Sequence, residues 1–392
     1  MKKTLLIIGG ISTIVILFAI WLYLLLFGTP KPVADVFTNF GLFGNSSELI
    51  EELPLPALPT EEIVDVVTDK LRQLTVRPVI GFQEYSAASN TPRRILYAES
   101  GTGHIYQINL ETGEETRLSN TTVINAQRAV FSPRLGYVAI RSGYQNLNEV
   151  QLVELNDSGS GQATTLKARV SDFSFSADNE LLYSELTTSG SNGIALNPKT
   201  KATRTVFTLP FQAATIIWSR DGITPHYVYP KASSKLFGYL YAIKNGVIVR
   251  QPAAGLGLMG SGNPEYISYA TVPLEEPISF IYNLSTDQTE ISPILFEPNK
   301  CAFGTKTVTR LFCGYALTAY GYNFPDDWYK GTRTFADRIW MINLSDSTAR
   351  QLVDPLRTVG RELDVIGMQV SSDEKMLYFL NKNDTTLWTY EI

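Results

Sequence analysis

Residues 173–184 have the sequence FSFSADNELLYS, in which a short apolar segment runs into a Ser/Asp turn and a second apolar segment follows. Aromatic and β-branched residues that alternate with polar ones on both sides of such a turn are typical of two antiparallel strands. The same arrangement recurs along the chain, for example as IWSRDG at residues 217–222, with an average spacing of about 46–48 residues. The first segments of the other units lie at residues 81–86, 129–133, 258–262, 301–304 and 368–373. The chain therefore contains an internal repeat of strand pairs.

A third strand is expected after each of these seven pairs, and a fourth strand after six of them. A candidate for the missing strand precedes the first unit, because KLRQLT at residues 70–75 is similar to TARQLV at residues 348–353. Four-stranded units that repeat at about 40–50 residues indicate a β-propeller. We therefore predict an all-β fold, a seven-bladed propeller over residues 68–392. Residues 70–75 would close the ring by pairing with the last blade, and six or eight blades are the alternatives.

The turns between first and second strands resemble a known repeat. Phe175–Asn179 and Trp218–Gly222 are similar to the F-S-P-D-G turn of TolB-type, WD40-like (PD40) propeller repeats. The resemblance covers residues 70–392 at the level of the repeat pattern, and it implies the fold but no particular activity. The fifth and sixth units depart from it, because Gly260–Gly262 and Phe303–Thr305 replace the usual turn.

The N-terminus contains an uncharged apolar run of 24 residues, 4–27. At 1.5 Å per residue a helix of this length reaches about 36 Å, enough to cross a hydrocarbon core of about 30 Å. The run is longer than the apolar core of a cleaved signal peptide, and Lys2 and Lys3 before it favour a cytoplasmic N-terminus. We predict a cytoplasmic tip and transmembrane anchor at residues 1–27, a Pro-rich acidic linker at residues 28–67, and a propeller outside the membrane.

Composition narrows the range of partners and chemistries. The net charge is −5, whereas binding to nucleic acid backbones needs clustered cationic charge, so we expect no nucleic-acid partner. With only two His and two Cys, the chain has little material for His-based catalysis or a zinc site, and we predict no cofactor and no metal.

The two cysteines, Cys301 and Cys313, lie symmetrically about Thr307 at the middle of a predicted hairpin. Facing residues of an antiparallel pair come within disulfide range, and disulfides persist outside the cytoplasm. We predict a structural disulfide; two buried thiols packed as small hydrophobes are the alternative.

No recognisable catalytic constellation is present. A G-x-G-x-x-G match at residues 255–260 is followed by a turn rather than a helix, so it lacks the context of a dinucleotide site. A propeller enzyme would need carboxylates that converge at the channel, and Glu84, Asp172 and Asp326 are the candidates.

One connection differs from the rest. In the sixth unit residues 314–337 separate the predicted second and third strands, and seven aromatic residues lie within this loop. Long ordered loops are usually functional, and Tyr and Trp are enriched in interface hot spots. Two interpretations of this loop therefore stand side by side: a surface that binds a partner, and a packed aromatic plug over the channel mouth. The predicted binding residues are Tyr320, Tyr322, Phe324, Asp326, Asp327, Trp328 and Tyr329.

Together these patterns favour a non-enzymatic, membrane-anchored extracytoplasmic scaffold that binds another envelope protein or a peptide. The alternatives are a propeller enzyme of hydrolase or lactonase type and a cell-wall carbohydrate-binding module.

Overall fold

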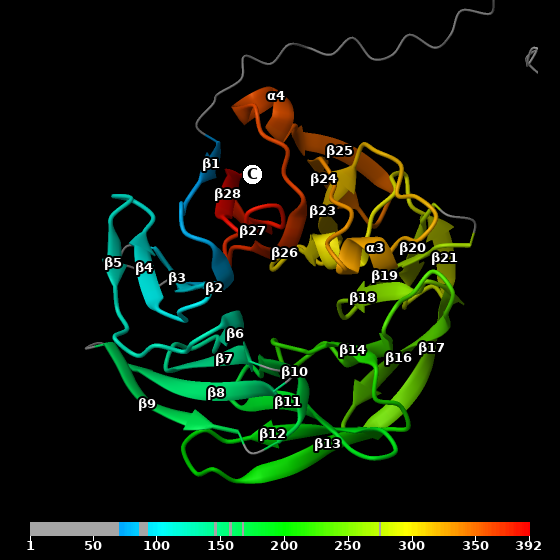
Figure 1. Ribbon diagram of the computed structural model, residues 1–392. Helices are drawn as coiled ribbons and strands as arrows, with labels where there is room; N and C mark the ends of the chain where they lie inside the picture. The colour runs from blue at the N-terminus through cyan, green and yellow to red at the C-terminus, as the bar shows by residue number, and fades with distance from the viewer. Residues whose placement is uncertain (1–69, 86–92, 145–146, 157–158, 167, 274–275) are drawn as a thin grey trace, which may run out of the picture. The chain divides into compact units, whose positions relative to one another are not determined.

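The computed structural model describes residues 70–85, 93–144, 147–156, 159–166, 168–273 and 276–392. The predicted anchor at residues 1–27 and linker at residues 28–67 lie outside this part. Within it, no helix has the length and apolar character needed to cross a membrane. The described residues form seven four-stranded antiparallel sheets that follow one another around a ring (Figure 1). The prediction of seven four-stranded blades is confirmed.

Each blade takes its strands from consecutive segments of the chain. Blade 1 consists of β2 (Val79–Tyr85), β3 (Arg94–Glu99), β4 (Ile105–Asn109) and β5 (Glu115–Arg117). Blade 2 consists of β6 (Ala126–Phe131), β7 (Tyr137–Tyr144), β8 (Leu147–Asn156) and β9 (Gly159–Thr165). Blade 3 consists of β10 (Val170–Phe175), β11 (Leu181–Leu186), β12 (Ser191–Leu196) and β13 (Thr203–Leu209). Blade 4 consists of β14 (Ala214–Ile217), β15 (His226–Pro230), β16 (Phe237–Lys244) and β17 (Val247–Leu256). Blade 5 consists of β18 (Met259–Gly262), β19 (Tyr266–Thr271), β20 (Ile278–Asn283) and β21 (Gln288–Ile291).

The last two blades carry the short helices. Blade 6 consists of β22 (Cys301–Phe303), β23 (Arg310–Ala316), β24 (Asp337–Asn343) and β25 (Thr348–Val353). Blade 7 consists of β26 (Val365–Val370), β27 (Met376–Asn381), β28 (Leu387–Glu391) and the N-terminal β1 (Leu71–Gln73). The helices are η1 (Pro298–Lys300), α3 (Asp326–Tyr329) and α4 (Pro355–Val359).

The ring is closed by pairing between the two ends of the propeller. In β1, Leu71 lies opposite Tyr390 and Gln73 opposite Trp388 in β28, which is the pairing predicted for residues 70–75. Without β1, the outer edge of β28 would be left unpaired and open to association with other chains.

Burial follows the position of a strand within its blade. All six residues of the second strand β19 are buried, whereas the outermost strands β5 and β21 are exposed along their whole length. Second strands are covered by the neighbouring blades on both faces and so contain near-continuous apolar residues, which is the pattern that identified them in the sequence.

The sixth blade differs from its prediction in strand position. Its second strand begins at Arg310 rather than Thr307, so the long connection covers residues 317–336 and Tyr315 lies on β23. The reason is Glu374 of blade 7, whose carboxylate accepts hydrogen bonds from the backbone N–H groups of Lys306 (3.0 Å) and Thr307 (2.9 Å). These bonds hold the segment as a turn, and a side chain at Gly304 would collide with the same carboxylate.

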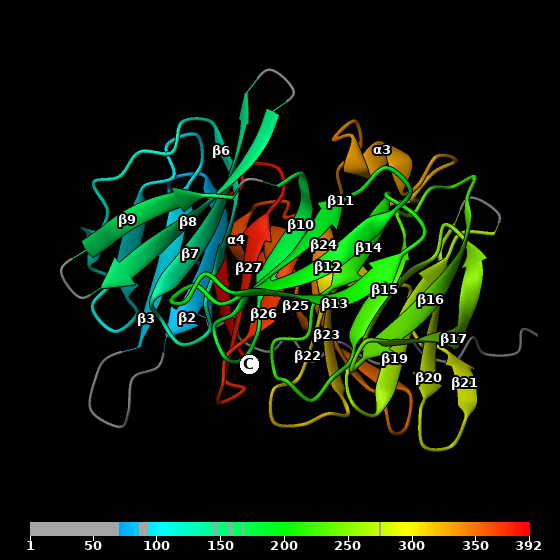
Figure 2. The ribbon, with the colours of Figure 1, turned by 90° about the horizontal axis from the view of Figure 1, so that it is seen from below.

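The two faces of the ring carry different connections. Loops between second and third strands emerge on one side, together with α3, and we call it the α3 face (Figure 2). Loops between first and second strands emerge on the other side. There Arg220 extends from blade 4 to Gln83 Oε1 of blade 1 and to the Phe131 carbonyl of blade 2, both at 2.9 Å. This side chain therefore links three blades.

Candidate functional site

The long connection of blade 6, residues 317–336, turns most of its aromatic side chains inward. Tyr320, Phe324, Trp328 and Phe335 are all buried, and the Tyr320 ring centroid lies 4.6 Å from that of Phe324 and 4.9 Å from that of Phe335. Three of the predicted binding residues, Tyr320, Phe324 and Trp328, therefore use their apolar area to pack the loop onto the propeller, and their role in binding stays a prediction.

The other predicted residues are more accessible. Tyr322 is 77% exposed, while Asp326, Asp327 and Tyr329 are half-buried. The buried rings of the loop are packed as the plug interpretation expects. Tyr322 and the outer side of α3 are the parts of the loop that a partner could contact.

Beneath the loop lies a buried ionic cluster. The Nζ atom of Lys300, which is fully buried, lies 2.6 Å from Asp337 Oδ2 and 2.6 Å from Asp364 Oδ1. Burial lowers the pKa of Lys300, but the two carboxylates together raise it above its ordinary value, so the ammonium stays charged. Trp328 completes the cluster, because its Nε1 donates to Asp364 Oδ2 at 3.0 Å. The partners of Lys300 lie 37 and 64 positions away, and no local pattern identifies them.

Glu297 is a second buried acid beside this cluster. Its Oε1 accepts a hydrogen bond from the backbone N–H of Asn299 at 3.1 Å, while Oε2 has no partner among the described residues. Burial raises the pKa of Glu297 to about 7. The Asn299 amide in turn contacts the hydroxyls of Tyr329 (3.2 Å) and Tyr229 (3.4 Å), and so connects the acid to α3.

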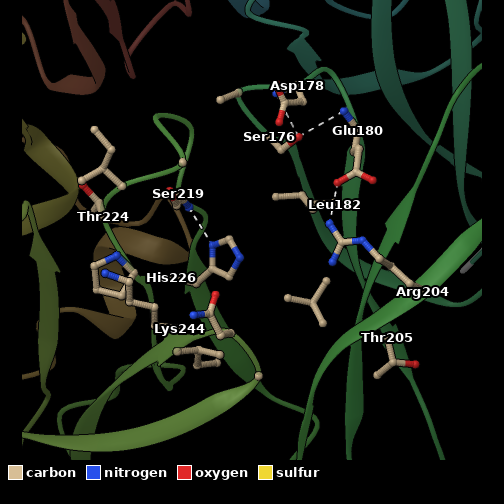
Figure 3. Close-up of a pocket in the computed structure, with 18 residues that line it drawn as sticks. Ser176, Asp178, Glu180, Leu182, Arg204, Thr205, Ser219, Thr224, His226 and Lys244 are labelled. Atoms are coloured by element: carbon tan, nitrogen blue, oxygen red, sulfur yellow. Dashed lines mark hydrogen bonds and ion pairs between the residues drawn. The ribbon is translucent and has the colours of Figure 1, made fainter.

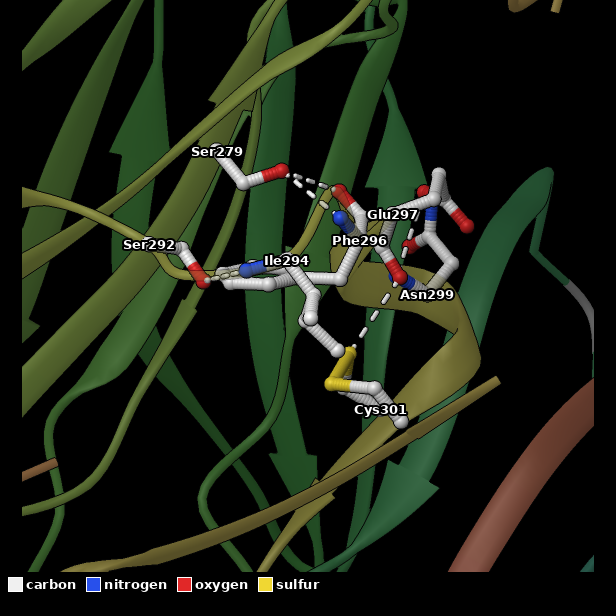
Figure 4. The surroundings of a disulfide bond; sticks show 8 residues. Ser279, Ser292, Ile294, Phe296, Glu297, Asn299 and Cys301 are labelled. Carbon is white, nitrogen blue, oxygen red and sulfur yellow. Dashed lines mark hydrogen bonds between the residues drawn. A yellow bond between two sulfur atoms is a disulfide. The ribbon is translucent and has the colours of Figure 1, made fainter. Parts of the chain in front are cut away.

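The predicted disulfide is confirmed and adjoins this segment. Cys301 and Cys313 are partners in the β22–β23 ladder with Cα atoms 4.1 Å apart, and they are bonded. Figure 4 shows the chain that leads to Cys301, in which the Ser279 hydroxyl accepts from the Phe296 N–H and donates to its carbonyl, both at 2.8 Å. Lys300 immediately precedes Cys301, so the disulfide fixes the strand pair next to the ionic cluster.

Helix α3 is also attached to blade 4. Asp326 Oδ2 accepts from the backbone N–H of Ser234 (2.7 Å) and from the hydroxyl of Ser233 (3.1 Å). Burial alone would raise the pKa of Asp326, but these hydrogen bonds lower it below its ordinary value. The connection between β15 and β16 therefore contacts the long connection directly.

A pocket of about 320 Å³ opens beside α3 at the mouth of the central channel. Its lining residues are Thr215, Lys231, Asn299, Trp328, Tyr329, Ile366 and Lys382. Thr215 and Ile366 belong to the innermost strands of blades 4 and 7, and the two lysines lie in connections on the α3 face. The surface is mostly apolar, with two cationic groups at its sides.

A larger pocket of about 410 Å³ lies on the opposite face, between blades 3 and 4 (Figure 3). His226 Nδ1 accepts from the Ser219 N–H at 2.9 Å, so the ring proton of the neutral imidazole is on Nε2. Burial lowers the pKa of His226. Arg204 is paired with Glu180 at 2.6 Å on the blade 3 side of this pocket, so these opposite charges compensate each other.

The three acids considered for catalysis do not converge. Glu84 pairs with Arg93 at 3.1 Å, Asp172 accepts from Trp218 Nε1 at 2.9 Å, and Asp326 binds the blade 4 loop. Within the described ranges, no three His, Cys, Asp or Glu side chains are grouped so that they could hold a metal ion.

The architecture places the protein among seven-bladed β-propellers. It is similar to the oligogalacturonate lyase of Vibrio parahaemolyticus (TM-score 0.52, 10% identity, 80% of this chain and 97% of that chain). An oligogalacturonate lyase in complex with manganese (TM-score 0.50, 9%, 80% and 96%) and a candidate 6-phosphogluconolactonase of Bacteroides fragilis (TM-score 0.50, 10%, 78% and 92%) are also similar. At such identities the likeness shows the fold alone. No protein-family model and no curated protein matches the chain.

Proposed function

We propose that this protein is a TolB-type, WD40-like propeller, anchored in the cytoplasmic membrane through residues 4–27, that acts outside it as a scaffold. It binds a segment of another envelope protein at the α3 face. The apolar N-terminal run supports the anchor. The Cys301–Cys313 disulfide supports an oxidising compartment.

The observation that carries the binding role is the exposure of large apolar side chains in the two segments that Asp326 joins on the α3 face. Leu317 and Tyr322 lie in the long connection, Leu236 lies in the blade 4 connection that binds Asp326, and Phe237 begins β16 directly after it. Large apolar side chains exposed on one face of a protein favour an interaction site there. Because the loop is held by buried rings and hydrogen bonds, little ordering entropy opposes binding.

The test is capture of partners by the full chain from cross-linked membranes. We expect Tyr322→Ala combined with Phe237→Ala to remove the partner. Ile223→Ala is the matched control, because Ile223 is 65% exposed on the opposite face. Loss of the partner in the α3-face variant only would support the proposal, and an unchanged partner set would contradict it.

The enzyme and carbohydrate-binding alternatives stay predictions. The structural neighbours include lyase and candidate lactonase propellers, and at their identities the likeness shows the fold alone.

A further inference from the structure

We propose that the pocket at the channel mouth holds a peptide carboxylate between Lys231 and Lys382. This inference rests on the proposed function, because it names the chemical group through which a partner segment is anchored at the α3 face.

The two lysines flank one aromatic surface. Lys231 directly follows β15 in blade 4, and its Nζ lies 5.9 Å from the centroid of the Tyr329 ring. Lys382 directly follows β27 in blade 7, and its Nζ lies 5.3 Å from the centroid of the Trp328 ring. The two ring centroids are 5.5 Å apart, so each lysine lies over one of two adjacent rings of α3, and both lysines line the same pocket.

Neither ammonium group has a carboxylate partner. Among the described residues, no carboxylate oxygen lies within 4.0 Å of the Nζ of Lys231 or Lys382. Both oxygens of Asp364 are already used, because Oδ1 binds Lys300 and Oδ2 accepts from Trp328 Nε1 and from the Phe335 N–H. Within the described part of the chain both ammonium groups therefore lack a direct carboxylate contact, which leaves them available to a ligand.

The location makes such a ligand favourable. Lys382 is partly buried, and burial lowers its pKa below the ordinary value; the nearby Asp364 carboxylate opposes this shift and the Lys300 ammonium adds to it. The ring faces offset part of the lost hydration, as in other cation–π contacts, but they carry no net charge. A carboxylate in contact with these ammonium groups would form charge-assisted hydrogen bonds, and water would screen the contact to the partly buried Lys382 less than the contact to the exposed Lys231.

The rest of the pocket defines what is attached to the carboxylate. Ile366 and the two rings of α3 form an apolar wall, while Thr215 and Asn299 offer hydrogen-bonding groups. This combination fits a carboxylate beside an apolar side chain. Two sources share that chemistry, the C-terminus of a chain that ends in an apolar residue and an Asp or Glu that adjoins one.

The full chain in detergent micelles can be titrated with three peptides: acetyl-Leu-Leu with a free carboxylate, its amide, and acetyl-Leu-Glu-Leu amide. We expect the free acid, the Glu peptide or both to bind at least tenfold more tightly than the neutral amide, and the tighter of the two identifies the source. Lys231→Met with Lys382→Met should remove this preference, because Met keeps the apolar stem and loses the charge. Lys235→Met, in the same loop but outside the pocket, should retain it.

Three results would overturn the inference: equal affinity for the acid and amide peptides, a preference that survives in the double Met variant, or no binding of any peptide. A thermal unfolding curve for each variant separates loss of charge from loss of fold, and Lys231→Arg with Lys382→Arg should restore the preference. The partner could still be captured by the double Met variant but not by the variant with Tyr322→Ala and Phe237→Ala. This result would refute the carboxylate site and leave the proposed function standing. If neither pair of substitutions abolishes capture of the partner, the proposed function is refuted.

Discussion

The indole N–H of Trp328 donates to Asp364 Oδ2 at 3.0 Å, and this bond helps to join the long connection of blade 6 to blade 7. The other oxygen of Asp364 binds Lys300, which is fully buried and whose Nζ lies 5.3 Å from the centroid of the Trp328 ring. The loop that shapes the channel-mouth pocket is therefore tied to the most deeply buried charges of the propeller.

Removal of the indole N–H should weaken this connection. Trp328→Phe keeps an aromatic ring but takes a hydrogen bond from a buried carboxylate, so we expect it to lower the free energy of unfolding by about 1–3 kcal/mol. Trp340→Phe is a matched control, because the Trp340 N–H has no partner among the described residues. Urea denaturation of both variants gives the comparison. Equal losses would mean that ring volume, rather than the bond to Asp364, accounts for the effect.

Loss of the buried cation should be more severe. Lys300→Met leaves Asp337 and Asp364 fully buried without their ammonium partner, and we expect a loss of about 3–5 kcal/mol. Addition of Asp337→Asn and Asp364→Asn to this variant removes the stranded charges and should recover part of that loss. A triple variant no more stable than Lys300→Met would contradict a charge-based account.

Glu297 should make stability depend on pH. Its folded pKa of about 7 exceeds the ordinary value of 4.5 because the acid is buried, and Lys300, Asp337, Tyr229 and Tyr329 are the titratable groups around it. The folded state therefore binds the proton more tightly than the unfolded state. Stability from this group is fully present below pH 4.5 and declines as pH rises to 7, by an amount on the order of 3 kcal/mol.

Glu297→Gln provides the control for this pH dependence, because it keeps the shape of the neutral acid and does not titrate. Unfolding midpoints measured between pH 4.5 and 7.5 should fall for the wild type and change less for the variant. Parallel curves for the two proteins would exclude Glu297 as the cause.

Reduction of the disulfide should destabilise the propeller. The Cys301–Cys313 bond spans 12 residues, and constraint of the unfolded chain over such a loop is worth about 3 kcal/mol. Dithiothreitol should lower the urea midpoint of the wild type and leave that of a Cys301→Ala, Cys313→Ala variant unchanged. Non-reducing mass spectrometry of protein isolated from cells gives a further test, because free thiols would count against an extracytoplasmic location.

Local patterns were sufficient to predict much of the fold and little of the candidate site. The turn at Ser176–Glu180 shows why the fold could be predicted, because its hydrogen bonds join residues that are close in the sequence. Ser176 Oγ accepts from the N–H of Asp178 (3.3 Å) and of Glu180 (3.1 Å). The inward orientation of the Trp328 side chain shows why the candidate site could not be predicted. The same aromatic loop could have formed an exposed surface, and its orientation depends on Asp364, which lies 36 positions away.

The sequence by itself predicted seven blades, with six or eight as alternatives, the closure of the ring by residues 70–75, and the Cys301–Cys313 disulfide, with two buried thiols as the alternative. These predictions depend on repeat length, strand alternation and hairpin symmetry, which can be recognised along the chain without knowledge of the contacts between blades. Only the tertiary structure decided that Lys300 pairs with Asp337 and Asp364, that Glu374 moves the start of β23 to Arg310, and that Lys231 and Lys382 line one pocket. These contacts join different blades, and single charged residues far apart in a chain carry no pattern until packing brings them together.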